Sequence, residues 1–251
     1  MIKNIRFLFL VILNIPVFAQ IKMRPVEQLI DKANTAWPFV KQQIDSGKNK
    51  IEVLAADSNT AKLALYQTQI TTRSPLGAVI INTGGILVDD GWIRILGSGN
   101  VKLKRSLPEW NKGKSFFIFG EIPTYILIAD DAVGGFFALN GTEFGKDKGN
   151  IYYLSPDRLI WEPLGFSYTE FLYFCFNNNL DDFYKDLRWK NWRKQVTKLS
   201  GNSVFNFFPF LWTKEGKEIN KTRRKIIAVQ SQFEFNMKSR KELGLEIKNV
   251  Q

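Results

Sequence analysis

The segment from Tyr125 to Trp161, YILIADDAVGGFFALNGTEFGKDKGNIYYLSPDRLIW, constrains the fold of this chain more than any other. Three apolar, aromatic-rich runs are separated first by a diacidic step with two glycines and then by a glycine-studded turn. Short apolar runs bounded by turn residues are typical of strands that pair with their sequence neighbours. We therefore expect an antiparallel β-meander here, followed by an aromatic residue, Trp161, where the chain leaves the meander.

Further elements are expected before the meander. The expected helices start at cap or proline residues, near Pro25, Ala36, Asp57 and Leu107. The expected strands are short apolar runs bounded by turn residues, at 78–81, 86–88 and 91–96. The residues Asn82-Thr83-Gly84-Gly85 between the first two runs indicate a hairpin.

After the meander, Ser167 is followed three residues later by Glu170, which is the capping-box pattern at the start of a helix. The following residues are apolar nearly all round, so this helix is expected to be central. Beyond it we expect helices at 180–187 and 189–199, an extended run at 205–212, a loop at 221–225 and a strand or helix at 226–235. The sequence has no repeat, which predicts a single α+β domain over residues 20–237, with the meander packed against aromatic-rich helices, and a polar tail at 238–251.

The first 19 residues have the pattern of a signal peptide. Lys3 and Arg6 precede an apolar run from Phe7 to Ile15, and Val17-Phe18-Ala19 supplies small residues at the usual positions before a cleavage site. The apolar run is shorter than the about 20 residues of a membrane-spanning helix. We expect cleavage after Ala19 and export to the periplasm or the medium. A buried N-terminal helix or an uncleaved anchor is the alternative.

The inventory of reactive side chains is small: the 251 residues include no histidine and a single cysteine, Cys175. Without histidine, a Ser-His-Asp or Cys-His nucleophile and a histidine-ligated zinc site are excluded. Cys175 lies in the apolar run FLYFCF, so we expect a buried, unreactive thiol. Phosphate-loop, dinucleotide and Gly-x-Ser-x-Gly motifs are absent as well. We therefore expect no cofactor and no metal, and an enzyme is not favoured.

Positive charge is concentrated near the C-terminus. The formal net charge is +11, and residues 185–251 alone carry 16 Lys and Arg against 6 Asp and Glu, a net of +10. Such asymmetry often marks an anionic partner, although charge runs also simply keep a surface soluble. Arg188 and Arg193 lie here beside Trp189 and Trp192, whose rings can stack on bases or sugars. The same spacing fits core packing with a basic outer face, and export argues against nucleic acid.

Four motifs carry a resemblance to a known family: SPLGAVIINTGGILVDDGWIRILGSG, IADDAVGGFFALNG, IYYLSPDRLIWEPLGFSYTEFL and DFYKDLRWKNW. Over residues 25–235 the chain resembles the bacterial domain-of-unknown-function family 2625, which implies no activity and no binding residue. More distantly, Gly134-Gly135-Phe136-Phe137, Tyr152-Tyr153 and the helix after Trp161 are similar to the SUKH superfamily. That similarity implies an immunity or protein-binding module, although such immunity proteins usually work in the cytosol and lack an export signal.

Diacidic steps are the main candidates for chemistry, at Asp89-Asp90, Asp130-Asp131 and Asp181-Asp182. Paired carboxylates can bind a hard cation or divide the roles of acid and base. Adjacent residues of a strand, however, point to opposite faces, and aspartate often bonds the backbone of a turn. Asp130 and Asp131 lie before flexible glycines, so we keep them as candidates, with turn duty as the alternative.

These observations favour a non-catalytic, monomeric binding module for a protein or cell-envelope partner. The expected binding residues are Asp130, Asp131, Phe136, Phe137, Arg188 and Arg193. The alternative is a carboxylate-dependent hydrolase of a polymer, with its acid and base among Asp130, Asp131, Asp157 and Glu162. Such a pair would face each other across an open cleft, roughly 5–9 Å apart. A third hypothesis is contact with an anionic lipid surface through the basic C-terminal third.

Overall fold

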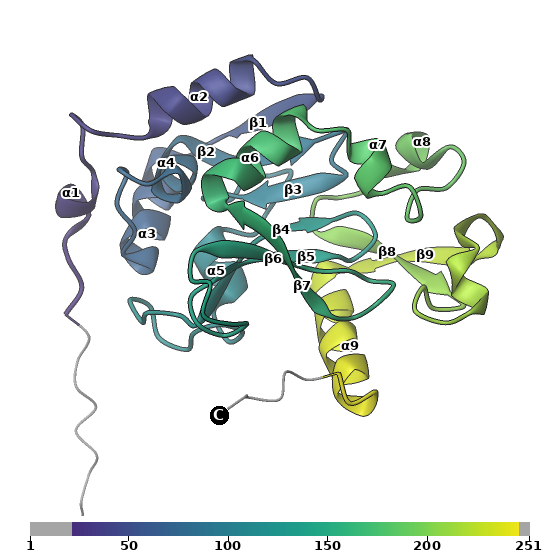
Figure 1. The fold of residues 1–251 in the computed structure, drawn as a ribbon. Coiled ribbons are helices and arrows are strands. Elements are labelled where there is room, and N and C mark those ends of the chain that lie inside the picture. Colours follow the sequence, from purple (N-terminus) through teal and green to yellow (C-terminus); the bar gives the residue numbers. More distant parts are fainter. Residues whose placement is uncertain (1–21, 246–251) are drawn as a thin grey trace, which may run out of the picture.

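The computed structural model describes residues 22–245, so the expected signal peptide lies outside the described residues. Its centre is an antiparallel sheet in which consecutive strands are neighbours, in the order β1 to β7 (Figure 1). These strands are β1 (Ile51–Ala55), β2 (Thr83–Val88), β3 (Ile93–Leu96), β4 (Tyr125–Asp131), β5 (Phe136–Asn140), β6 (Asn150–Leu154) and β7 (Trp161–Ser167). A separate antiparallel ribbon is formed by β8 (Ser203–Phe208) and β9 (Arg223–Ala228). The expected α+β fold with an antiparallel meander is confirmed.

Helices pack around this sheet on both sides. They are α1 (Val26–Leu29), α2 (Trp37–Asp45), α3 (Ser58–Thr68), α4 (Pro75–Asn82), α5 (Leu107–Asn111), α6 (Tyr168–Asn177), α7 (Leu180–Phe183), α8 (Trp192–Val196) and α9 (Val229–Glu242). Short 3-10 turns occur at Glu215–Lys217 and Ile219–Lys221. Within residues 22–245, no helix combines the length and apolarity that crossing a bilayer requires.

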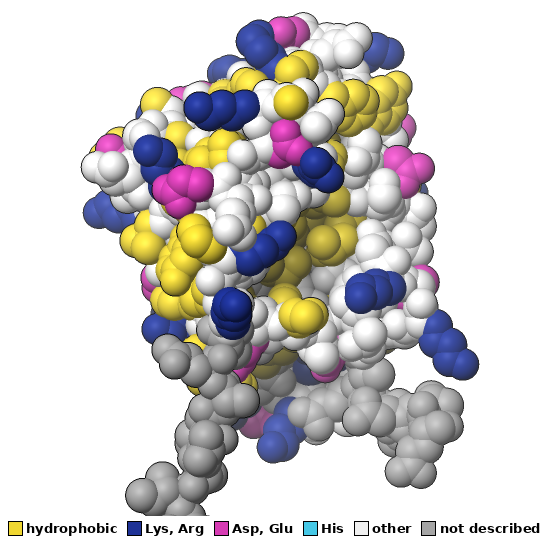
Figure 2. Space-filling model, turned by 90° about the vertical axis from the view of Figure 1, so that its left-hand side faces the viewer, with side chains coloured by type: hydrophobic (Ala, Val, Ile, Leu, Met, Phe, Trp, Pro, Cys, Tyr) yellow, Lys and Arg dark blue, Asp and Glu magenta, His cyan; other side chains and the backbone are white. Residues whose placement is uncertain are grey.

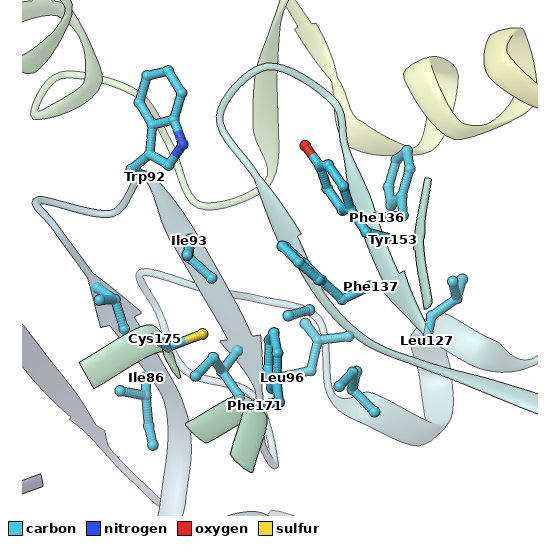
Figure 3. Close-up of a cluster of buried hydrophobic side chains, with 14 of the residues drawn as sticks. Ile86, Trp92, Ile93, Leu96, Leu127, Phe136, Phe137, Tyr153, Phe171 and Cys175 are labelled. Carbon is cyan, nitrogen blue, oxygen red and sulfur yellow. The ribbon is translucent and has the colours of Figure 1, made fainter. Parts of the chain in front are cut away.

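Two neighbouring phenylalanines of β5 show how the layers are arranged. The Phe137 ring lies 5.0 Å from Phe171 of α6, whereas the Phe136 ring lies 5.1 Å from Phe233 of α9 (ring centroids). Because alternate residues of a strand point to opposite faces, α6 covers one face of the sheet and α9 the other. Figure 3 shows Phe171 and Cys175 of α6 among the apolar side chains of the sheet. Cys175 is buried as expected, and burial raises the pKa of its thiol.

Local capping signals were reliable predictors of the helices. The Ser167 side chain accepts from the Glu170 N–H and the Glu170 side chain accepts from the Ser167 N–H, so the capping box is confirmed. Asp57 caps α3 as expected, by accepting from Asn59 and Thr60. Each of these caps satisfies N–H groups that have no partner within the helix.

The expected strand at 78–81 is wrong, because these residues belong to α4. Ser74 accepts a hydrogen bond from the Gly77 N–H at 3.1 Å, and Pro75 takes the first helical position. The helix is buried almost throughout, and a short apolar run that is buried on all sides has no period that distinguishes helix from strand. The hairpin is therefore formed by β2 and β3, with its turn at 89–92 instead of 82–85.

Other differences concern exposed or short elements. The edge strands β1 and β7 were not expected, since β1 is largely exposed, β7 is mostly half-buried, and neither has a strict apolar alternation. Strand β9 covers much of the expected loop at 221–225, and α9 continues to Glu242, beyond the expected start of the tail. The helices expected at 180–187 and 189–199 are single turns, α7 and α8. Tertiary contacts decide such elements more than local pattern does.

Candidate functional site

Asp130 lies inside the molecule between two arginines. Its Oδ1 accepts from Nε of Arg94 at 2.6 Å, and its Oδ2 accepts from NH1 of Arg105 at 2.5 Å. Arg94, which stands directly opposite Asp130 in the sheet, also donates to the Ser203 carbonyl at 2.8 Å. Burial lowers the pKa of Arg105, and the Asp130 carboxylate opposes that shift. This buried group ties β3 and β4 to the beginning of β8.

Asp131 points to the other face of the sheet. Its Oδ1 accepts from the N–H groups of Val133 at 3.0 Å and Gly135 at 2.8 Å, and so holds the β4–β5 turn. Its Oδ2 accepts from the hydroxyls of Tyr153 at 2.6 Å and Tyr184 at 3.2 Å. Burial raises the pKa of the Asp131 carboxyl, and these hydrogen bonds act in the opposite direction. The arrangement is the turn duty that is common for aspartate.

The four candidates of the meander are therefore not surface residues. Asp130, Asp131, Phe136 and Phe137 are all fully buried, and the two carboxylates serve separate groups on opposite faces of the sheet. In this conformation they offer no area to a partner and no shared site to a cation or substrate. The opposite directions follow from the alternation along β4.

Arg188 and Arg193 lie instead around the turn between β2 and β3. Asp89 accepts from NH2 of Arg188 at 2.5 Å, and Asp90 accepts from NH1 of Arg193 at 2.8 Å and from Nζ of Lys50 at 2.5 Å. Both aspartates have positive φ, 52° and 61°, which is uncommon for residues other than glycine and costs backbone energy. The turn thus gathers two carboxylates and three cations.

The two arginines differ in accessibility. The Arg188 side chain is only 6% exposed, and its guanidinium lies 4.0 Å from the Trp192 ring and 4.7 Å from the Trp92 ring. The Arg193 side chain is 50% exposed, and its guanidinium lies 4.4 Å from the centre of the Trp192 ring. Arg188 consequently acts inside the fold, whereas Arg193 is within reach of a partner.

A polar cleft of about 380 Å³ opens beside this turn, and we call it the β1–β3 cleft. Its floor includes Glu52, Leu87 and Arg94, from three adjacent strands. Its rim and walls are formed by Lys50, Asp90, Gly91, Val101, Lys102, Val196, Thr197, Leu199, Ser200 and Gly201. Arg94 therefore lies at the cleft floor, and its partner Asp130 lies behind it, outside the cleft lining.

Exposed lysines at the rim are held by carboxylates of the same cleft. Lys50 pairs with Asp90, and Lys102 pairs with Glu52. Burial would raise the pKa of Asp90, but hydrogen bonds from Lys50 and Arg193 hold that pKa below its usual value. Ion pairs with an exposed lysine contribute only about 0–1 kcal/mol, so these cations can exchange their partners for an anionic ligand at little cost.

A second cleft, of about 320 Å³, is acidic, and we call it the acidic cleft. Asp157, Glu162 and Asp186 line it together with Arg158, whose guanidinium pairs with Glu162 at 2.6 Å. Burial raises the pKa of Asp157, and Ser155 donates to its carboxylate. Among the described residues, no group of three or more Cys, Asp or Glu is arranged to hold a metal ion. Two of the four carboxylates considered for hydrolysis thus share a cleft.

Of the residues that build the β1–β3 cleft, the sequence analysis considered Asp90, as part of a diacidic step, but did not keep it among the expected binding residues. Glu52 belongs to the unexpected strand β1, Lys50 directly precedes that strand, and Lys102 lies in a loop. The diacidic step followed by glycine at Asp89-Asp90-Gly91 was visible, and such residues favour a turn with positive φ. Placing the hairpin at that turn would have directed attention to Asp90.

Comparisons with known proteins agree on the family. The family model described as "Protein of unknown function DUF2625" matches residues 26–232. An "Uncharacterized protein" of Haemophilus influenzae is 43% identical over 223 residues, which cover 89% of this chain and 98% of that protein. The "Putative uncharacterized protein YbfG" of Escherichia coli K12 is 39% identical over 213 residues, 85% of this chain and 95% of its own length. No solved structure matches the chain significantly. The extent of the match confirms the expected resemblance: the chain belongs to the DUF2625 family.

Proposed function

We propose that the protein is a non-catalytic binding module whose β1–β3 cleft receives an anionic group of a protein or cell-envelope partner. The observation that carries the proposal is the combination of two exposed cations of the cleft, Lys50 and Lys102, with a floor residue, Arg94, that is fixed by its buried pair with Asp130. Arg193, outside the cleft lining, adds a half-exposed cation on Asp90. A cleft with few, well-placed polar groups is the usual form of a specific binding site.

Preorganisation supports this assignment. Arg94 bonds Asp130, the Ser203 carbonyl and the Asp131 carbonyl, so its guanidinium has a fixed direction before any ligand arrives. Arg105 bonds the Gly201 carbonyl at 2.8 Å and thereby holds one wall of the cleft. A site that is ordered in advance loses less entropy on binding than a flexible one.

Export to the cell envelope is part of the proposal. The basic run, the apolar run and the small residues before position 20 support cleavage after Ala19. Mass spectrometry of the protein recovered from a periplasmic fraction is expected to give Gln20 as the first residue. Recovery of the intact chain from the cytoplasm would contradict export and would remove the envelope partner.

The binding proposal is tested with an acidic probe of defined chemistry. A fluorescent peptide of consecutive glutamates is expected to bind the chain lacking residues 1–19 at low salt, and added salt weakens the complex because charges are screened. Lys102→Glu is expected to weaken binding at least tenfold. Lys241→Glu on the exposed surface of α9 makes the same change in net charge elsewhere and is expected to have little effect. Equal losses in both variants would mean that the probe senses overall charge, and the cleft would not be its site.

A second candidate function rests on the acidic cleft, where Asp157 and Glu162 lie together. Burial raises the pKa of the Asp157 carboxyl, and a carboxyl of raised pKa that shares a cleft with a second acidic residue is the pattern of acid and base in polymer hydrolases. This candidate predicts release of soluble fragments from purified envelope polysaccharide, and loss of that release in both Asp157→Asn and Glu162→Gln. If the unmodified protein releases nothing, or if both variants release as much as the parent, the hydrolase hypothesis fails.

A further inference from the structure

We propose that the loop at 116–122 and the apolar pocket behind it form a docking surface for an anionic phospholipid bilayer. This surface shares no residue with the β1–β3 cleft, so the inference goes beyond the proposed function. Three large apolar side chains stand out from the loop: Phe117 is 75% exposed, Ile118 is 57% exposed and Ile122 is 93% exposed. Apolar side chains this exposed and this close together in sequence usually mark an interaction surface.

The pocket behind the loop has an apolar lining and a volume of about 230 Å³. Its apolar residues come from the segment after α3, from α4, from the loop and the residue that follows it, and from β4 and β5: Ile70, Leu76, Phe116, Pro123, Tyr125, Ile126 and Leu139. Figure 2 looks at the side of the molecule that carries α1 and α3, and hydrophobic side chains line a hollow in the middle of that face. The loop is held there by a hydrogen bond from the Gly120 N–H to the Gln67 carbonyl at 3.2 Å. An acyl chain is an occupant of matching chemistry.

Lysines border the apolar side chains, as they do in proteins that bind at membrane interfaces. The Lys112 ammonium lies 4.5 Å from the centre of the Phe119 ring, and the exposed Lys148 lines the pocket. The acidic neighbour Glu121 also lines the pocket, and its carboxylate is engaged by the Phe117 N–H, from which it accepts at 2.8 Å. Basic groups beside exposed apolar residues are complementary to anionic headgroups above acyl chains.

The N-terminal end of the described residues lies beside this pocket. Arg24 donates from its backbone and from its guanidinium to Gln69, both at 2.8 Å, and Gln69 lies between residues 68 and 70, which line the pocket.

The test is cosedimentation with vesicles, using the chain without residues 1–19, which keeps every described residue. It is expected to bind vesicles of phosphatidylglycerol and phosphatidylcholine more strongly than vesicles of phosphatidylcholine alone, and salt is expected to reduce that difference. The double variant Phe117→Ser/Ile122→Ser is expected to lose at least tenfold in binding to both kinds of vesicle. Lys148→Glu is expected to lose binding to the anionic vesicles only. Because these side chains are exposed, the variants are expected to keep the parent's thermal midpoint.

A matched control is available on the β8–β9 ribbon, which lies on the other side of the molecule (Figure 1). Phe208 and Ile226 are also exposed, so Phe208→Ser/Ile226→Ser removes similar apolar area and is expected to leave vesicle binding unchanged. Absence of vesicle binding by the parent, or equal losses in the two double variants, would overturn the proposal. A concentration-dependent dimer in solution that Phe117→Ser/Ile122→Ser abolishes, without vesicle binding by the parent, would identify a second copy of the chain as the occupant instead.

Discussion

The same dipeptide, Asp-Asp, occurs at 89–90 and at 130–131, but the two places differ in the burial and in the partners of its carboxylates. Asp130 and Asp131 lie at the end of a central strand, are fully buried, and are satisfied by Arg94, Arg105, two tyrosines and backbone groups. Asp89 and Asp90 form a turn with positive φ and pair with cations that include the exposed Lys50 and the half-exposed Arg193. The buried step contributes to the fold, whereas the turn step holds cations beside the β1–β3 cleft.

The difference shows that position, and not residue type, decides the role of a carboxylate. In a strand the two side chains diverge, so each recruits its own partners on one face of the sheet. In the left-handed turn both are brought to one edge, beside a cleft. Substitutions at the buried step, Asp130-Asp131, and at its partners are expected to separate these roles most clearly.

The largest effect is expected for Arg94→Met. It leaves Asp130 buried with Arg105 as its remaining charged partner, and breaking a buried pair in this way costs about 3–5 kcal/mol. Urea unfolding followed by circular dichroism measures the loss. Lys50→Met removes an exposed partner of Asp90 and is expected to cost no more than about 1 kcal/mol. Similar losses in the two variants would contradict the distinction between the steps.

A somewhat smaller effect is expected for Asp131→Ala, which leaves buried hydroxyl and N–H donors without their acceptor. We expect a loss of about 2–3 kcal/mol in the free energy of unfolding. Asp131→Asn keeps an acceptor for the turn and should recover at least half of that loss. If alanine and asparagine were equally destabilising, the negative charge itself, and not hydrogen bonding, would hold this site together.

At the turn, Asp90→Asn is expected to change stability by less than about 1 kcal/mol, since asparagine also tolerates positive φ. Its effect should appear in binding. Loss of this carboxylate releases Lys50 and Arg193, so the glutamate peptide is expected to bind about 2–5-fold more tightly. Fluorescence anisotropy measures the change, and unaltered or weaker binding would mean that Asp90 does not compete with the ligand.

The smallest effect concerns Lys114, which borders the buried cluster with its ammonium 4.0 Å from the Trp110 ring. Burial, together with the nearby Arg105, lowers the pKa of Lys114 from 10.5 to about 8. Between these values the unfolded chain binds a proton that the folded chain has released, so the free energy of unfolding rises with pH across this window. Relative to the parent, Lys114→Met should lack that rise. Urea unfolding at several pH values from 7.5 to about 10 compares the two proteins, and parallel pH profiles would contradict the shift.

Local signals predicted much of the fold. Glycine-bounded apolar runs predicted β4 to β6, and Ser167, Glu170 and Asp57 predicted two helix starts. The helix α4 escaped prediction because its apolar residues are buried on every side. Strand β1 was not predicted because most of its side chains are exposed, and its contribution to the floor of the cleft was therefore missed as well.

Long-range partners explain why the site was only partly predicted. Arg193 was predicted as a binding residue, but its partner Asp90 lies 103 residues earlier in the chain. Asp130 is held by Arg94, 36 residues away, and Arg94 reaches the Ser203 carbonyl over 109 residues. No spacing along a single sequence encodes such pairs, since they depend on the order in which strands and loops assemble in space.

The measurement that tests the account most directly is site-specific photocrosslinking to a partner in cell-envelope extract. A benzophenone side chain is placed at Thr197 in the β1–β3 cleft, at Asp186 in the acidic cleft, and at Lys241 on α9 as a control. We predict one discrete adduct from position 197 that Lys102→Glu abolishes, and none from 186 or 241. An adduct from position 186 alone, or adducts of equal yield from all three positions, would contradict binding at the β1–β3 cleft.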